Sequence, residues 1–366
     1  MYFRPQNGAV SADVIPFYDN GKFYLFYLRD YRNKEKHGEG TPWCLLETKD
    51  LVKYFDYNEV LIRGNEEEQD LYVFTGSCVK FNDEYRIYYT GHNPHLREKG
   101  LPEQKIMMAR SKDLIHREKE KKFIFEAPSY LEMHDFRDPF VFFDDSKNKW
   151  AMLIAGRIKS DAPYFTKGVT LIAYSDNGIK WELSEHYFYA PNAYFAHECP
   201  DLFKIGDWYY LIFSEFTDKI CTKYVMSKNL NGPWHAPKYD SFDGHAYYAA
   251  KSISDGKRRI LFGWNPIKDK EIDNNLWQWG GTIIPHEIYQ DKISGELFVR
   301  CPKEISEQYS KETKIEKTHI YGEVIEEKTF KFNNEGRNIL TFNKLPTNCK
   351  LTFDFKTDDR GELAFI

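Results

Sequence analysis

The stretch DNGKFYLFY, residues 19–27, shows the pattern that decides the fold: an Asx-Gly turn followed at once by a strand rich in aromatic residues. Four further stretches of this kind follow: NDEYRIYY at 82–89, DDSKNKWAMLI at 144–154, GDWYYLIF at 206–213 and DGKRRILFG at 255–263. Asx and Gly residues between β-rich runs are the strongest short-range signal of a hairpin. The strands begin at residues 22, 84, 149, 208 and 258, at intervals of 50 to 65 residues. Such spacing indicates a repeat fold.

Each hairpin extends into a larger module. A third apolar segment follows four of the hairpins, at 45–48, 107–110, 171–174 and 223–226, and a fourth strand fits after the next turn, as at 181–183. Helical periodicity is scarce, and abundant β-branched and aromatic residues favour strands. Four strands in each of five units predict an all-β fold, a five-bladed β-propeller with only short, protected edges. A β-sandwich, the alternative, would show more uniform strand spacing and no four-strand module.

The repeat pattern ends near residue 305, so we predict a propeller domain over residues 1–305. A charged segment, 306–317, is typical of a linker, and β-like stretches follow it up to residue 366. About 50 residues do not easily close a sandwich alone. Residues 306–366 are therefore expected to form a linker and the start of a partial or truncated β-sandwich-like domain.

Charge and hydropathy exclude several classes of partner. The formal net charge is −5, and both signs are interspersed without a basic stripe, so no nucleic-acid partner is expected. No apolar run approaches the roughly 20 residues that span a bilayer, so no membrane partner is expected either. The first residues, MYFRP, lack the basic and apolar regions of a signal peptide, which predicts a cytoplasmic protein.

Cysteine and histidine usage argues against disulfides and metals. The six cysteines are scattered without a Cys-x-x-Cys pair, and in a chain of this length without a secretion signal free thiols are expected. The 11 histidines form no His-Glu-x-x-His spacing. We therefore expect no metal and no cofactor.

Three acidic residues hold corresponding places in three of the repeated units. Asp13 lies in SADV, Asp138 in FRDP and Glu198 in ECPD, and each precedes an apolar strand, a polar turn and an aromatic strand. The first strands of propeller blades line a central channel, so these acids and Ser77 should converge at one mouth. A single Asp there is usually a turn residue, but three buried carboxyls are costly unless they are used. Paired carboxyls that flank a bond cleave glycosides.

Five motifs, in order, resemble those of glycoside hydrolase family 32, the invertase, inulinase and levanase group. FRDP and ECPDLF resemble its Arg-Asp-Pro and Glu-Cys-Pro signatures, and FTGS, residues 74–77, is similar to its aromatic-Ser-Gly-Ser strand. TPW at 41–43 with KDLV at 49–52 resembles its Trp…Ser-x-Asp-Leu-Val stretch. WGGTIIPHE at 279–287 resembles its Trp-Gly-Gly…Leu-Pro-Arg-Glu segment, so the resemblance covers roughly residues 1–305.

The resemblance implies a role for each acid. Asp13 would be the nucleophile that attacks the anomeric carbon of a β-fructofuranosyl unit, and Glu198 would be the general acid and then the base. Asp138 would hold ring hydroxyls, and the neighbouring Arg137 would favour its charged form. The implied reaction is retaining hydrolysis of sucrose or fructo-oligosaccharides, which requires carboxyls about 5–5.5 Å apart. The residues expected to bind substrate are Arg137, Phe74, Ser77, Trp43 and Trp279.

Three positions depart from the family pattern. Ala12 stands where the first motif has Asn, Leu28 stands where a Gln is common, and His286 replaces the usual Arg. Two of these changes remove amides that could contact a sugar. Several other aromatic residues, Trp264 among them, could stack on sugar rings, although most aromatics are expected in the core. The reaction class is therefore better supported than the substrate.

Three alternatives stay open. An arabinosidase or xylosidase of the same architecture would act on another furanoside or pyranoside and would invert, with carboxyls about 6.5–9.5 Å apart. A sugar-binding propeller could have lost catalysis, although binding alone does not need Asp13, Asp138 and Glu198 together. A fructosyltransferase would share the covalent intermediate and pass it to a sugar. The sequence leaves undecided linkage, exo or endo action, a phosphate on the substrate and the oligomeric state.

Overall fold

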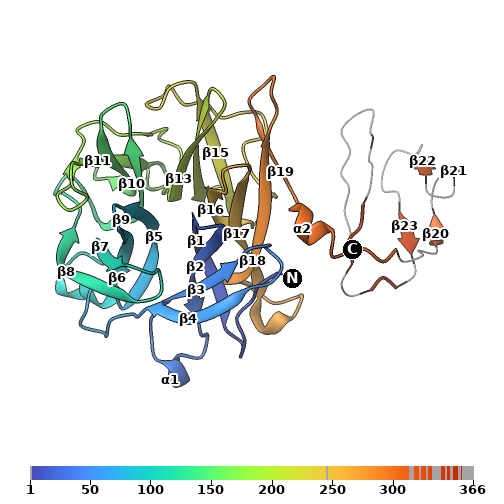
Figure 1. Cartoon of the computed structure of the whole chain (residues 1–366), viewed down its shortest axis with the longest axis horizontal. Coiled ribbons are helices and arrows are strands. Elements are labelled where there is room, and N and C mark those ends of the chain that lie inside the picture. The colour runs from blue at the N-terminus through green and yellow to red at the C-terminus, as the bar shows by residue number, and fades with distance from the viewer. Residues whose placement is uncertain are drawn as a thin grey trace. The chain divides into compact units, whose positions relative to one another are not determined.

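The structure is a computed structural model. It describes residues 2–244 and 246–312 and the short stretches 317–320, 323–326, 329–331, 339–342, 344–346, 349–352 and 356. The chain divides into two compact units, Met1–Pro302 and Lys303–Ile366 (Figure 1). Strands account for 52% of the structure and helices for 6%, so the protein is nearly all-β as predicted.

In chain order, the strands of the first unit fall into five antiparallel groups. The first holds β1 (Val10–Asp19), β2 (Lys22–Asp30), β3 (Trp43–Thr48) and β4 (Phe55–Leu61). The second holds β5 (Tyr72–Phe81), β6 (Glu84–His92), β7 (Gln104–Ser111) and β8 (Arg117–Phe125). The third holds β9 (Leu131–Asp144), β10 (Lys149–Ile158), β11 (Gly168–Ser175) and β12 (Glu182–Leu183).

The fourth group holds β13 (Glu198–Ile205), β14 (Trp208–Glu215) and β15 (Cys221–Ser227). The fifth holds β16 (Tyr248–Ser254), β17 (Arg259–Lys268), β18 (Trp277–Gln290) and β19 (Leu297–Arg300). A pairing between Ser11 and Gly281 joins the first and fifth groups into one eight-stranded sheet. The short helices of this unit are α1 (Lys34–His37), η1 (Pro94–Lys99), η2 (Tyr164–Thr166) and η3 (Asp269–Glu271).

The five aromatic segments predicted from the sequence are strands, and each is the second strand of its group: β2, β6, β10, β14 and β17. The turn before β2 shows why the local signal was reliable. Asn20 and Gly21 both adopt positive φ, 50° and 76°. Two consecutive positive φ values define the hairpin turn that Asn-Gly favours, and this turn fixes the register of the strands on both sides.

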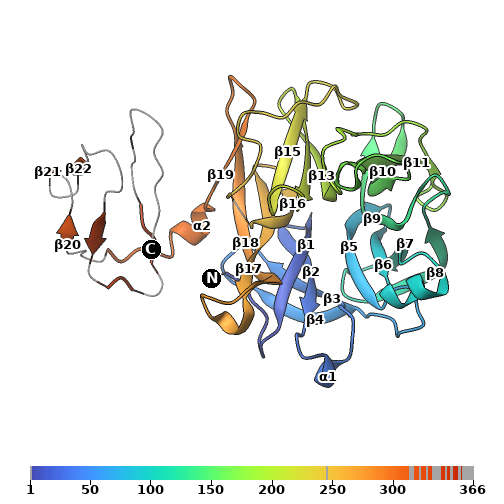
Figure 2. The same cartoon turned by 180° about the vertical axis from the view of Figure 1, so that it is seen from behind.

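The first strands of the groups lie together in the middle of the unit (Figures 1 and 2). β1 contacts β5, β5 contacts β9, β9 contacts β13, β13 contacts β16, and β16 contacts β1. Apolar clusters fill the spaces between neighbouring groups, for example Ile106 of β7 with Leu171 of β11 and Leu153 of β10 with Leu211 of β14. The core therefore lies between the groups and leaves the first strands around a common centre.

The second unit begins with α2 (Lys303–Ser306). Two strand pairs follow: β20 (Lys317–Ile320) with β23 (Leu340–Phe342), and β21 (Glu323–Glu326) with β22 (Thr329–Lys331). That this unit starts a β-sandwich stays a prediction, and the strand expected at residues 362–366 lies outside the described residues. Among the described residues, no helix has the length and apolar character needed to cross a bilayer.

Candidate active site

All five first strands carry an irregularity in strand pairing. The register shifts fall between Ala12 and Val14 in β1, between Phe74 and Gly76 in β5, and between Glu198 and Asp201 in β13, with equivalents in β9 and β16. A bulge leaves its extra residue unpaired and redirects its side chain. The residues at these five bulges include Asp13, Thr75, Asp138, Cys199 and Ala249. The repeated bulge is therefore what brings distant parts of the sequence to one centre.

Three of these bulge residues adopt a backbone conformation that most residues avoid. Asp138, Cys199 and Ala249 have φ values of 59°, 52° and 52°. Positive φ at residues other than Gly costs on the order of 1 kcal/mol or more and persists only where the surrounding structure holds it. Such strain clusters at functional sites.

The acids predicted from the sequence meet in one cavity of about 220 Å³. Its lining includes all three predicted catalytic residues, Asp13, Asp138 and Glu198. Three of the predicted substrate contacts, Arg137, Phe74 and Trp279, line it as well. The remaining lining residues are Arg97, Glu103, Gln104, His134, Asp135, Cys199 and Tyr248.

The other two predicted substrate contacts, Trp43 and Ser77, do not line the cavity. Trp43 is fully buried, and its Nε1 donates a hydrogen bond to the Phe74 carbonyl at 3.2 Å. The Ser77 hydroxyl accepts a hydrogen bond from the Val141 amide at 3.0 Å, which joins β5 to β9. Both side chains therefore support the wall of the site from behind.

Asp13 is held by two donors. The Thr75 hydroxyl donates to Oδ2 at 2.5 Å, and the indole of Trp264, which was expected to stack on a sugar, donates to Oδ1 at 2.9 Å. Burial raises the pKa of Asp13 to about 6; the two donors oppose the rise, and the charges of Asp138 and Glu198 add to it. Asp13 is therefore ionised above about pH 6, and its reactive oxygens have a fixed orientation.

The raised pKa of Asp13 predicts a pH-dependent stability. Folding moves this pKa from 3.8 to about 6, so between these pH values the folded protein holds a proton that the unfolded chain releases. The stabilisation from that proton is complete below about pH 4 and is lost as the pH rises through 6, about 3 kcal/mol in all. Urea unfolding of the wild type and Asp13→Asn from pH 4 to 7 measures it. If both proteins show the same pH slope, Asp13 is not its source.

Asp138 is fixed by the main chain. Its amide donates to the Thr90 hydroxyl at 2.8 Å, and its Oδ2 accepts from the amide of Cys199 at 2.9 Å. Burial raises the pKa of Asp138, while Arg137, with Nε 3.8 Å from Oδ2, opposes the rise. Burial and the neighbouring carboxylates raise the pKa of the Cys199 thiol far above its usual value, so this cysteine stays a thiol and does not act as a nucleophile.

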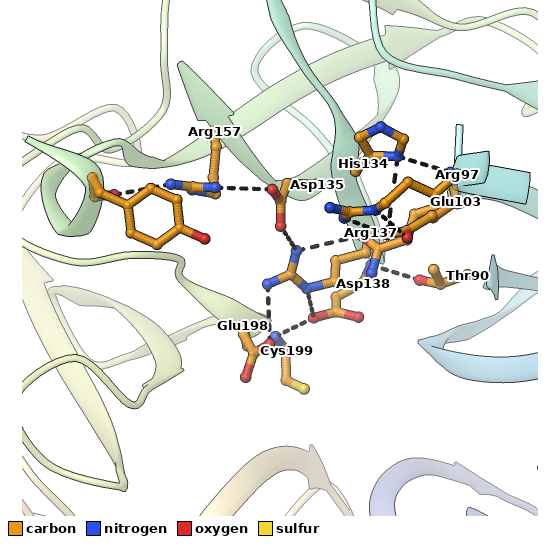
Figure 3. A network of polar contacts seen from close by, with 12 residues as sticks. Thr90, Arg97, Glu103, His134, Asp135, Arg137, Asp138, Arg157, Glu198 and Cys199 are labelled. Carbon is orange, nitrogen blue, oxygen red and sulfur yellow. Dashed lines mark hydrogen bonds and ion pairs between the residues drawn. The ribbon is translucent and has the colours of Figure 1, made fainter. Parts of the chain in front are cut away.

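Glu198 has a partner on each oxygen. Arg137 Nη2 donates to Oε1 at 3.0 Å, and the hydroxyl of Tyr248 donates to Oε2. Figure 3 shows the Arg137 guanidinium between Glu198 and Asp135. The carboxyl of Glu198 is therefore oriented by one cation from β9 and one hydroxyl from β16.

The mouth of the cavity is polar on one side and aromatic on the other. Arg97 forms a two-point ion pair with Glu103, with His134 beside it (Figure 3). On the aromatic side, Phe74 stacks on His92 with ring centres 4.8 Å apart. Phe74 and Trp279 also line a second cavity of about 310 Å³, so the two rings separate two neighbouring hollows.

Sequence reasoning missed Thr75, Tyr248, Asp135 and Gln104. Thr75 had a usable signal, because it stands in its unit where Asp13 and Asp138 stand in theirs. Gln104 lines the cavity, and its Oε1 accepts from Arg137 Nη1 at 3.3 Å. It supplies an amide to the site, whereas Ala12 and Leu28, which replace the two expected amides, are apolar and buried. Tyr248 had no signal, since its partner Glu198 lies 50 residues away in another group of strands. Asp135 had none either, because its second partner, Arg157, comes from the neighbouring strand β10.

The chain is similar to known proteins along most of its length. Residues 3–301 match the model of the glycosyl hydrolases family 32 N-terminal domain. The raffinose invertase of Escherichia coli is 25% identical over 341 residues, which cover 88% of this chain and 68% of that protein. The levanbiose-producing levanase of Bacillus subtilis is 28% identical over 245 residues, covering 64% of this chain and 42% of that protein.

A solved structure shows the same fold. Fructan 1-exohydrolase IIa from Cichorium intybus superposes with a TM-score of 0.68 at 18% identity, covering 87% of this chain and 62% of that one. The chain spans roughly two fifths to two thirds of the length of the curated relatives that it matches.

Proposed function

We propose that this chain, which belongs to glycoside hydrolase family 32, uses the cavity around Asp13 and Glu198 to release a terminal β-fructofuranosyl unit from sucrose or a fructan. One observation carries the proposal: three carboxyls from three strands line a single small cavity, and each has its own partners. Burying a carboxyl group costs free energy, so a site that gathers three of them indicates that they take part in catalysis.

In the first step, an oxygen of Asp13 attacks the anomeric carbon of the fructosyl unit. The bond to the leaving oxygen breaks as Glu198 gives that oxygen its proton, and a covalent fructosyl–Asp13 ester forms. Thr75 and Trp264 hold the attacking carboxylate in one orientation, so little reorganisation precedes attack. Asp13 has to be ionised and Glu198 protonated at this point, as in other pairs of carboxyls with divided roles.

In the second step, Glu198 removes a proton from water, and the resulting nucleophile attacks the same carbon and frees Asp13. Two inversions give net retention. Asp138, which forms an ion pair with Arg137, would lie at the ring hydroxyls and stabilise the positive charge that develops on the sugar.

The size of the cavity favours exo action. A volume of about 220 Å³ lies below the roughly 300–1,000 Å³ of ordinary ligand pockets, and it suits one sugar ring. The second cavity, beyond Phe74 and Trp279, lies beside the mouth and suits part of the leaving group. We therefore expect cleavage of one terminal fructosyl unit at a time.

The proposed scaffold is a five-bladed propeller. The circular contacts of β1, β5, β9, β13 and β16 support it, as does the division of the strands into five groups. We propose no metal and no cofactor for the reaction. A cytoplasmic location stays a prediction from the sequence, and cell fractionation tests it.

Product analysis tests the proposed function. We expect free fructose from sucrose and from inulin- and levan-type oligosaccharides, and methyl β-fructofuranoside when methanol is present. The methyl α-product would show inversion and overturn the assignment of Asp13 as nucleophile. Turnover of aryl arabinofuranosides alone would show that the protein is a glycosidase but that its substrate is not a fructoside. Sugar binding without turnover of any of these would favour the binding propeller.

A further inference from the structure

We propose that Asp135 is a positioning residue that shares the charge of Arg137 with Glu198, so that Glu198 can carry the proton that it gives to the leaving group. The inference rests on the proposed function. It resolves a conflict in the geometry, because a general acid paired with a buried guanidinium would otherwise be held in its ionised form.

Arg137 donates hydrogen bonds to two carboxylates and lies 3.8 Å from a third, that of Asp138. Its Nη1 donates to Asp135 Oδ1 at 2.9 Å, and its Nη2 donates to Glu198 Oε1 at 3.0 Å (Figure 3). Only 7% of the Arg137 side chain is exposed, so solvent screens these interactions weakly. The two carboxylates bind different nitrogens of one cation and therefore compete for its charge.

Asp135 is in turn held from the far side. Arg157 Nη1 donates to its Oδ2 at 3.0 Å, and Arg157 Nη2 donates to the Tyr164 carbonyl at 2.9 Å. The Arg157 guanidinium lies 3.8 Å from the ring centre of Phe195 and 4.6 Å from that of Tyr164. Stacking and hydrogen bonds fix Arg157, which fixes Asp135 and through it Arg137.

The charges around Glu198 show why Asp135 matters. Arg137 and Asp138 face it from β9, Asp13 from β1, Tyr248 from β16 and Cys199 from its own strand. Lys251, also on β16, donates to the Pro200 carbonyl at 2.6 Å. Arg137 is thus the cation in hydrogen-bond contact with Glu198 among the described residues. Asp135, by hydrogen bond, and Asp138, at 3.8 Å, both share its charge with Glu198.

Replacing Asp135 by Asn removes the competing charge. More of the positive charge of Arg137 then acts on Glu198, which favours the ionised form of that carboxyl. The activity that depends on protonated Glu198 should be lost at lower pH, so the basic limb of the pH profile of kcat/KM moves down by about one pH unit. The profile on sucrose measures this, and KM at low pH should change little.

Matched variants separate charge from structure. Asp135→Glu keeps the charge and should keep the position of the basic limb. Glu132→Gln is the matched control, because Glu132 lies on the same strand but pairs with Lys167 and not with Arg137. This variant should leave the pH profile of kcat/KM unchanged. Arg157→Gln removes the cation behind Asp135, so the limb should move to higher pH; this variant keeps the test decisive if Asp135→Asn does not fold.

The outcomes distinguish this inference from the proposed function. A basic limb that stays in place in both Asp135→Asn and Arg157→Gln overturns the role of Asp135, even if activity falls. A wild type that hydrolyses none of the fructosides overturns the proposed function itself. Movement of the limb in opposite directions in the two variants supports both.

Discussion

Replacing Asp13 by Asn is expected to lower kcat by at least about ten-thousand-fold while the protein stays folded. The amide of Asn is nearly the same size as the carboxyl, but it does not attack an anomeric carbon, and no covalent ester forms. The indole of Trp264, which can only donate, keeps the amide oxygen as its acceptor, and the Thr75 hydroxyl can accept from the amide NH2 in place of donating, so the site keeps its shape. Initial rates on sucrose, with near-UV circular dichroism for the fold, measure the effect.

Asp19→Asn is the matched control, because Asp19 ends the same strand and bonds to the Tyr85 hydroxyl at 2.7 Å, away from the cavity lining. It should keep activity within about twofold, because the partners of Asp19, which are Asn20, Lys80 and Tyr85, do not line the cavity. If Asp13→Asn kept more than a hundredth of the wild-type rate, Asp13 would not be the nucleophile.

Replacing Glu198 by Gln is expected to lower kcat on sucrose by about a thousandfold, the usual order for loss of general acid–base catalysis. The loss should be much smaller on an aryl fructoside, because a good leaving group departs without a proton. Azide should then raise the rate by attacking the covalent intermediate without a base, giving a β-fructosyl azide. Product identification by NMR checks both expectations.

Glu182→Gln, at an exposed position on β12, controls for the loss of one carboxyl and should leave all three rates unchanged. Equal losses of Glu198→Gln on sucrose and on the aryl fructoside would argue against an acid role. They would indicate that Glu198 acts on substrate binding or on the position of Tyr248 instead.

Much of the architecture could be predicted because its signals are local. The turn at Asn20 and Gly21 is encoded in two adjacent residues, and the aromatic strands carry their own period. The acids could be predicted because Asp13 and Asp138 recur at corresponding points of a repeated unit. In a repeat fold, corresponding residues of successive units lie at equivalent places in space.

What could not be predicted depends on pairing between strands. Ser77 was expected in the cavity, yet Thr75, two residues earlier, is the hydroxyl that reaches Asp13. The bulge between Phe74 and Gly76 decides between them, and a bulge is a property of two strands that the sequence of one does not show. Tyr248 and Asp135 depend likewise on neighbours that lie 50 and 22 residues away in the chain.

The repeated bulge also bears on how such a scaffold diversifies. Residues outside the hydrogen-bonded ladder can be exchanged with little effect on the ladder itself, so selection for a new reaction at these positions is partly uncoupled from selection for folding. Thr75 and Ala249 occupy the same place in their units as Asp13 and Asp138, with quite different side chains. The five bulge positions surround one centre, so single substitutions at them can change the chemistry of the site stepwise.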